Sequence, residues 1–205
     1  MIYKQSISVV VPIYNDSEVI HELIKRLGPV LESITADYEI ILVDDGSRDD
    51  SWLQMLAVRQ ANACIKAVRL SRNFGQQSAI AAGLSLTSKE LIVLMDSDLQ
   101  DRPEDIPVLI DALLADEKAT MAIAQWEERK DSRFKLAVSR LFQRVSNSIT
   151  EIHTMPRLGI FRVMKKNQEA VLQQEEDSST SIHTAVPNRV PLHHTQTSTL
   201  ETLPS

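Results

Sequence analysis

Three apolar runs rich in β-branched residues constrain the fold of this chain more than any other feature of its sequence. They read ISVVVPIYN, YEIILVDDGS and ELIVLMDSDLQD, and each ends abruptly in a polar loop. Continuous apolar runs of this kind are typical of parallel strands that are buried on both faces of a sheet. A fourth, shorter strand is expected at IKAVRLS, residues 65–71.

Helical patterns separate these strands along the chain. We expect helices over residues 18–34, 51–62, 76–86 and 103–114, and a further strand, TMAIAQW, at residues 120–126. This alternation predicts an α/β fold with a Rossmann-like, mostly parallel sheet and helices on both faces. A chain of 205 residues has room for one such domain with a substantial core.

The remaining residues have a different composition. A basic amphipathic segment over residues 127–150 closes the main domain, which is predicted to span residues 1–150. Its Lys and Arg side chains suit either solvent or an anionic lipid surface. Residues 175–205 contain no glycine and no Phe, Trp or Tyr, and are rich in Ser, Thr, His and Pro. Their apolar residues follow neither the helical nor the strand periodicity. We therefore predict a disordered tail there.

Charge and composition exclude several classes of function. The formal net charge of −6 argues against a nucleic-acid partner, because such proteins carry a basic excess. The single cysteine, Cys64, cannot form an internal disulfide, which fits the reducing cytoplasm. No run of about 18 apolar residues occurs, so no transmembrane helix is predicted. Any membrane contact is expected to be peripheral, at the inner face of the membrane.

The strongest chemical signal is an acid pair, Asp96 and Asp98, directly after the third apolar run. In an extended segment, residues i and i+2 project to the same side. In open parallel sheets, ligands bind beyond the carboxyl ends of the strands, where these acids fall. Two carboxylates beside a diphosphate suit a hard divalent ion such as Mg²⁺. Taken alone, the pair is also compatible with ordinary loop or helix-cap chemistry.

Two further polar loops follow strands of the same predicted sheet. In VDDGSRDDS, Asp44 and Asp45 lie where a nucleotide base and ribose could be hydrogen-bonded. Ser47 is a candidate helix cap with Asp50 as its capping-box partner. In the loop PIYNDSE, three residues could line the same crevice: Pro12, Tyr14 and Asn15.

Four motifs in this order resemble the family 2 inverting glycosyltransferases. They are VVPIYND, ILVDDGSRDDS, LSRNFGQQSAIAAGL and VLMDSDLQDRPE, and the resemblance extends over residues 7–172. The chain is most similar to the polyprenyl-phosphate branch, which includes dolichol-phosphate mannose synthases and bactoprenol glucosyltransferases. The resemblance implies a GT-A type nucleotide-diphospho-sugar transferase fold and a donor sugar linked to UDP or GDP.

The resemblance also implies roles for individual residues. Donor-binding residues would be Pro12, Tyr14, Asn15, Asp44, Asp45, Asp96 and Ser97. Asp96 and Asp98 would hold Mg²⁺ or Mn²⁺ against the diphosphate. The RNFG segment, residues 72–75, is either a turn that starts a helix or a direct substrate contact. Residues 151–174 would form a segment on the acceptor side.

One departure from the family pattern bears on the acceptor. Ile160 stands in LGIFRVM where related sequences often have an aspartate, so a base at this position is in doubt. A lipid phosphate acceptor needs no strong base, because its second pKa of ~6 leaves it mostly dianionic at neutral pH. Arg162, together with Arg129 or Arg133, could bind the phosphates of the donor or of the acceptor. Asp98 and Asp101 are the catalytic candidates, with Asp101 either a residual base or an N-terminal helix acid.

The predicted function is therefore metal-dependent, inverting sugar transfer from a nucleotide diphosphate sugar to a polyprenyl phosphate. Branch members often continue into two transmembrane helices that this sequence lacks. The sequence is then either a peripherally docked enzyme or a truncated, inactive remnant that still binds nucleotide. A soluble family 2 transferase acting on a saccharide hydroxyl is a further alternative, and it would require a general base. A dinucleotide-dependent oxidoreductase is disfavoured, because no GxGxxG follows the first strand.

Overall fold

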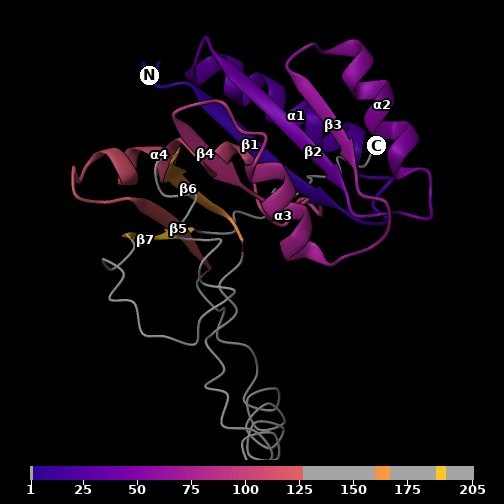
Figure 1. Cartoon of the computed structure of the whole chain (residues 1–205). Helices are drawn as coiled ribbons and strands as arrows, with labels where there is room; N and C mark the ends of the chain where they lie inside the picture. Colours follow the sequence, from indigo (N-terminus) through magenta and orange to yellow (C-terminus); the bar gives the residue numbers. More distant parts are fainter. Residues whose placement is uncertain (1, 127–159, 167–187, 193–205) are drawn as a thin grey trace, which may run out of the picture.

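The computed structural model describes residues 2–126, 160–166 and 188–192, and it places them in an α/β fold (Figure 1). The elements are β1 (Ile7–Ile13), α1 (Ile20–Ile34), β2 (Tyr38–Asp44), α2 (Ser51–Ala61), β3 (Ile65–Arg69), α3 (Gln76–Leu84), β4 (Leu91–Leu94), the 3-10 helix η1 (Pro103–Asp105), α4 (Ile106–Leu114), β5 (Met121–Trp126), β6 (Arg162–Lys165) and β7 (Asn188–Leu192). The predicted α/β class is confirmed. Each expected helix and strand forms within a few residues of its predicted bounds.

One sheet contains the seven described strands, in the order β3-β2-β1-β4-β6-β5-β7. The first four run parallel, with β1 paired to β2 on one side and to β4 on the other. β6 is antiparallel to both of its neighbours, β4 and β5, while β5 and β7 pair in parallel. The sheet is therefore mostly parallel, as predicted, with one antiparallel strand inserted beside β4.

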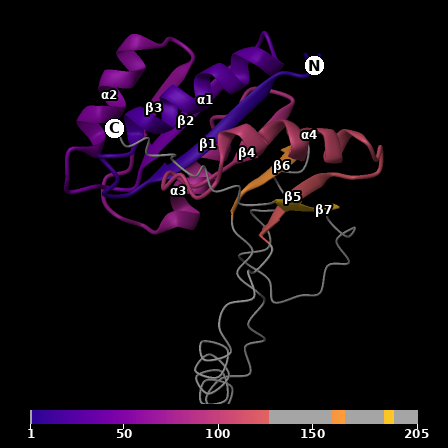
Figure 2. The same cartoon turned by 180° about the vertical axis from the view of Figure 1, so that it is seen from behind.

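Helices cover both faces of the sheet, which Figures 1 and 2 view from opposite sides. Alternate residues of a strand point to opposite faces. On β1, Val9 and Val11 pack in the core under α1, α2 and α4, whereas Val10 packs in the second core under α3. Burial of the strands on both faces explains why their sequences read as continuous apolar runs.

A glycine lets α3 lie close against the sheet. A Cβ at Gly83 would lie 2.4 Å from Val10 Cγ1 and 3.1 Å from Val43 Cγ2. No side chain fits in that space without displacement of β1 or β2. Close packing here sets the height of α3 above the strands, and so the position of its first residue at the carboxyl edge of the sheet.

The domain boundaries predicted from composition remain predictions. β6 falls within the predicted acceptor-side segment, residues 151–174, and β7 falls within the predicted tail, residues 175–205. The basic segment over residues 127–150 lies outside the described residues. Among the residues that are described, no helix combines the length and the apolar character needed to cross a membrane.

Candidate active site

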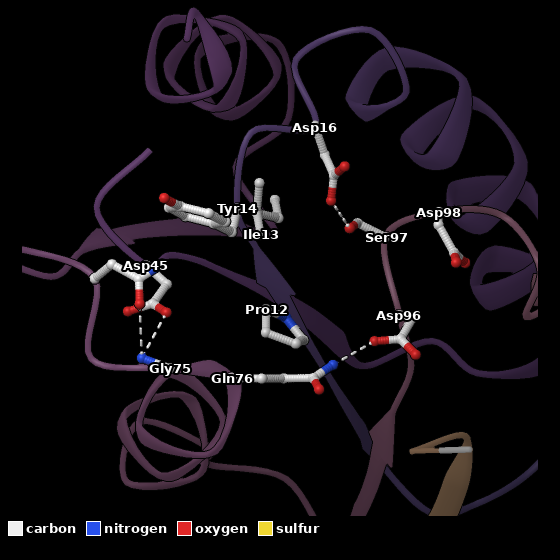
Figure 3. Close-up of a pocket in the computed structure, with 11 residues that line it drawn as sticks. Pro12, Ile13, Tyr14, Asp16, Asp45, Gly75, Gln76, Asp96, Ser97 and Asp98 are labelled. Atoms are coloured by element: carbon white, nitrogen blue, oxygen red, sulfur yellow. Dashed lines mark hydrogen bonds between the residues drawn. The ribbon is translucent and has the colours of Figure 1, made fainter. Parts of the chain in front are cut away.

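A pocket of about 400 Å³ opens at the carboxyl ends of the central strands (Figure 3). Strand order reverses here, because β2 lies on one side of β1 and β4 on the other. Open α/β sheets bind their ligands at such a reversal. The pocket is lined by Pro12, Ile13, Tyr14, Asp16, Asp45, Asn73, Gly75, Gln76, Asp96, Ser97 and Asp98.

The structure brings most of the sequence-predicted site residues together. Those that line the pocket are Pro12, Tyr14, Asp45, Asp96, Ser97 and Asp98. Three other predicted residues, Asn15, Asp44 and Asp101, are not among the lining residues and instead support the surrounding loops. The functional roles assigned to all of them remain predictions.

The predicted phosphate-binding arginines are only partly described. Arg162 begins β6 and pairs in register with Leu94, two residues before Asp96. Its side chain is half-buried, and its Nε donates a hydrogen bond to the backbone oxygen of Ile160 at 3.0 Å. Ile160 is itself buried in the apolar cluster under α3. Arg129 and Arg133 lie outside the described residues.

The loop after β1 is held by the loop after β2. Asn15 adopts a left-handed backbone conformation, with φ of 57°, which asparagine tolerates better than most residues. Its N–H donates to Ser47 Oγ at 3.0 Å, and its Oδ1 accepts from the Arg48 N–H at 2.8 Å. Tyr14 precedes this turn, and its side chain is 41% exposed at the pocket. The turn therefore leaves Tyr14 exposed at the pocket.

Ser47 has a different role from the predicted helix cap. Helix α2 begins at Ser51 with Asp50 as its N-cap, and no side-chain hydrogen bond caps it. The Ser47 hydroxyl is used by Asn15 instead. Competition between a local cap and a contact 32 residues away is invisible to local sequence patterns.

Asp44 and Asp45, at the end of β2, are buried but face different partners. Asp44 Oδ1 accepts from the Ser47 N–H at 2.8 Å. Its Oδ2 lies 3.0 Å from Arg69 Nε, close enough for an ion pair but out of line for a hydrogen bond. Arg69 also donates to the Ser47 carbonyl at 3.1 Å. Asp44 thus stabilises the loop and is shielded from the pocket.

Asp45 accepts hydrogen bonds from the backbone of the RNFG segment that precedes α3. Its two carboxylate oxygens accept from the N–H groups of Phe74 at 2.8 Å and Gly75 at 2.9 Å. Gly46 permits this approach, since a Cβ there would lie 2.5 Å from the Arg72 carbonyl carbon, and its φ is +69°. Residues 72–75 are therefore a helix-start turn. Because Asn73 and Gly75 also line the pocket, the turn can contact a ligand as well.

The acidic loop after β4 is fastened at several points. Asp96 Oδ1 accepts from Gln76 Nε2 at 2.7 Å, and Asp98 Oδ1 accepts from the Gln100 N–H at 3.0 Å. The Ser97 hydroxyl donates to Asp16 Oδ2, which ties this loop to the loop after β1. The Asp96 N–H in turn donates to Asp101 Oδ2 at 3.0 Å, below the pocket.

The electrostatics of this loop favour a cation. Burial, and then the neighbouring charge of Asp98, raises the pKa of Asp96, against the lowering effect of the Gln76 hydrogen bond. The charge of Asp16 raises the pKa of Asp96 further. Burial likewise raises the pKa of Asp101 to about 6, with further contributions from Asp96 and Asp98. Carboxylates that crowd one another in this way are stabilised when a cation binds between them.

The donor set fits a hard divalent ion. Asp96 and Asp98 supply carboxylate oxygens, which Mg²⁺ and Mn²⁺ prefer. Within the part of the chain that the structure describes, no cluster of three or more His, Cys, Asp or Glu side chains could hold a metal. An ion at the acid pair would therefore complete its coordination with water or with ligand phosphates, as Mg²⁺ usually does.

Sequence reasoning missed two polar residues that line the pocket, Asp16 and Gln76. Asp16 belongs to the polar loop PIYNDSE, whose other members were singled out, so loop membership was an available signal. Gln76 is the first residue of α3, directly after the RNFG turn. Its contact with Asp96 joins residues 20 positions apart, so local sequence patterns do not predict it.

The chain belongs to glycosyl transferase family 2, whose family model matches residues 8–172. The pocket residues and the acidic loop after β4 are all contained in the matched region. The predicted family is thereby confirmed.

Solved structures with the same fold include a mycobacterial protein, with 22% identity and a TM-score of 0.55 over 80% of this chain and 54% of that one. Another is glucosyl-3-phosphoglycerate synthase from Mycobacterium tuberculosis, in complex with Mn²⁺, UDP-glucose and phosphoglyceric acid. It has 21% identity and a TM-score of 0.56 over 80% of this chain and 57% of that one. A second structure of that synthase has 18% identity and a TM-score of 0.59 over 96% of this chain and 74% of that one. The chain thus spans little more than half of the first two proteins. At these identities the likeness shows the GT-A type fold alone.

Proposed function

We propose that this chain transfers a sugar from a nucleotide diphosphate sugar to a phosphate-bearing polyprenyl lipid, with inversion and with Mg²⁺ or Mn²⁺. The observation that carries the proposal is the acid pair Asp96 and Asp98 in a pocket that also contains Tyr14 and Asp45. Membership of glycosyl transferase family 2 and the Mn²⁺ and UDP-glucose bound to a structural neighbour support it.

In this proposal the two sides of the pocket have different tasks. Tyr14 and Asp45 hold the nucleoside of a UDP- or GDP-linked donor, together with Pro12, because Tyr14 and Asp45 lie across the pocket from the acid pair (Figure 3). Asp96 and Asp98 hold the metal and Ser97 lies between them in sequence. A bound Mg²⁺ or Mn²⁺ supplies charge stabilisation for the departing nucleoside diphosphate. We assign phosphate binding to Arg162, which pairs in register with Leu94, two residues before Asp96 in sequence.

Two positions considered as a base from the sequence, Ile160 and Asp101, are both described by the structure, and neither suits that role, which favours a phosphate acceptor. Ile160 is apolar and buried, so it cannot accept a proton. Asp101 is only 3% exposed and does not line the pocket, and its Oδ2 is already occupied by the Asp96 N–H. A phosphate dianion can attack the anomeric carbon without base assistance. The acceptor of the structural neighbour, phosphoglyceric acid, also carries a phosphate. It is therefore the main alternative to a polyprenyl phosphate as the acceptor of this chain.

The test is a transfer assay with the full chain. Radiolabelled UDP- and GDP-sugars are offered with Mg²⁺ or Mn²⁺ and one of three acceptors: undecaprenyl phosphate, phosphoglycerate or an oligosaccharide. We expect label in the lipid fraction, abolished by a chelator. Label in phosphoglycerate or in the oligosaccharide instead would overturn the lipid acceptor but keep the transferase. Nucleotide binding without any transfer would identify the chain as an inactive remnant.

A further inference from the structure

Gln76 bridges two elements across the floor of the pocket. It is the first residue of α3, and its side-chain Nε2 donates to Asp96 Oδ1 at 2.7 Å, as Figure 3 shows. The contact joins the helix under one face of the sheet to the loop after β4. Its length is typical of a strong hydrogen bond to a carboxylate.

The position of Gln76 is itself fixed from below. Asp45 accepts hydrogen bonds from the two residues that precede it, Phe74 and Gly75. Gly75 adopts φ of +94°, a conformation that glycine tolerates and that turns the chain into α3. Close packing of Gly83 on Val10 holds the same helix against β1. Backbone and helix are therefore both anchored before the Gln76 amide reaches Asp96.

The contact leaves Asp96 with one oxygen engaged and one available. Oδ1 accepts from Gln76, whereas Oδ2 accepts no hydrogen bond from the residues that the structure describes. The Gln76 amide is neutral, so it orients the carboxylate without cancelling its charge. A lysine at this place would orient Asp96 equally well but would repel a metal ion.

We propose that Gln76 is a positioning residue that fixes the rotamer of Asp96 and reserves its Oδ2 for the divalent ion, which Asp96 therefore binds through one oxygen. The inference rests on the proposed function, because it needs the metal site at Asp96 and Asp98. Groups that orient metal ligands in this way typically contribute 10- to 100-fold to metal affinity.

The test compares Gln76→Leu with Gln77→Leu, a matched control at the exposed next residue of α3. Mn²⁺ binding to the full chain with UDP present is measured by electron paramagnetic resonance, and UDP binding is measured separately in a chelator. We expect Gln76→Leu to weaken Mn²⁺ binding about tenfold, with metal-free UDP binding and the thermal unfolding midpoint unchanged. Gln77→Leu should leave all three readouts as in the wild type.

A second variant separates positioning from general damage to the fold. Because Gln76 acts through Asp96, adding Gln76→Leu to Asp96→Ala should weaken Mn²⁺ binding no further. Mn²⁺ affinity of Gln76→Leu within twofold of wild type would overturn the inference and leave the metal site standing. Losses that add in the double variant would also overturn it. A wild-type chain that binds no Mn²⁺ with UDP would overturn the metal site first, and the inference with it.

Discussion

Glu39, at the amino edge of the sheet, and the acids of the loop after β4, at its carboxyl edge, have opposite electrostatic surroundings. At the amino edge, Glu39 on β2 has a side chain only 6% exposed, and donors surround it. Its Oε1 accepts from the Ser8 hydroxyl at 2.6 Å and from the Ser88 N–H at 2.7 Å, while Lys66 Nζ lies 2.6 Å from Oε2. Burial alone would raise the pKa of Glu39, but these partners lower it to about 2.

At the carboxyl edge, the acids repel one another. Asp96 receives one side-chain hydrogen bond, from a neutral amide, and burial beside Asp98 raises its pKa. Asp101 behaves in the same way, with a pKa of about 6. Carboxylates with complete partners stabilise the fold, whereas carboxylates left in mutual repulsion mark a site that awaits a ligand. A buried carboxylate is therefore a structural group at Glu39, whereas the acids of the loop after β4 are candidates for a functional role.

The largest expected effect comes from the carboxyl edge. Asp98→Asn removes a proposed metal ligand and should lower sugar transfer roughly 100- to 1000-fold, because the metal contributes several kcal/mol to the stabilisation of transition-state charge. The unfolding free energy should not fall, since a repulsive charge has been removed. Transfer rates and urea unfolding measure the two quantities. The control is Asp116→Asn, an exposed acid outside the pocket, and equal activity of the two variants would contradict the comparison.

At the amino edge, a substitution is expected to lower stability and to leave activity unchanged. Glu39→Gln keeps the shape but loses the charge, and at pH 7 it should lower the unfolding free energy by about 2 kcal/mol, the usual value of hydrogen bonds to a charged group. Transfer activity of the folded protein should stay within twofold of wild type.

The stabilisation by the Glu39 charge should depend on pH in a defined direction. A lowered pKa contributes stability that is present above the ordinary value of 4.5 and lost as the pH falls toward about 2. Urea unfolding from pH 7 to pH 2 should therefore show the wild type and Glu39→Gln converging in acid. Parallel curves over the whole range would show that Glu39 is not a stabilising carboxylate.

The smallest expected effect concerns Asp101. Because its pKa is raised, its ionised form costs stability above pH 6, and this cost disappears below the ordinary value of 3.8. In a chelator, Asp101→Asn should raise the unfolding free energy by about 1 kcal/mol at pH 7.5 and by nothing at pH 3.5. Sugar transfer should fall less than tenfold. Abolished transfer would instead favour a hydroxyl acceptor with Asp101 as its base.

Local sequence patterns predicted much of this molecule because its first 126 residues alternate buried strands with helices. The runs ending at Asn15, Asp45 and Asp98 were recognisable since parallel strands buried on both faces are apolar throughout. The acids at their ends were then predicted to converge, as the pocket confirms for Asp45, Asp96 and Asp98. Topology supplied the proximity that sequence order alone does not show.

The features that escaped prediction depend on distant contacts. β6 is four residues long and pairs with strands far from it in sequence, so it has no periodicity of its own. Ser47 satisfies Asn15 instead of capping α2, and Gln76 meets Asp96 only after the sheet has formed. In each case the decisive contact is between residues far apart in sequence, and it forms only through tertiary packing.

The placement of β6 has a consequence for the order in which the chain can fold. During synthesis, β4 is complete at residue 94, but the strand that pairs with its outer edge begins only at Arg162. Until then the outer edge of β4 lacks its pairing strand, and β5 can pack on α4 but lacks the strand that joins it to β4. The part of the pocket formed by the loops after β1 and β2 can thus assemble early on the ribosome, while the β4 edge stays open to other chains until β6 has emerged.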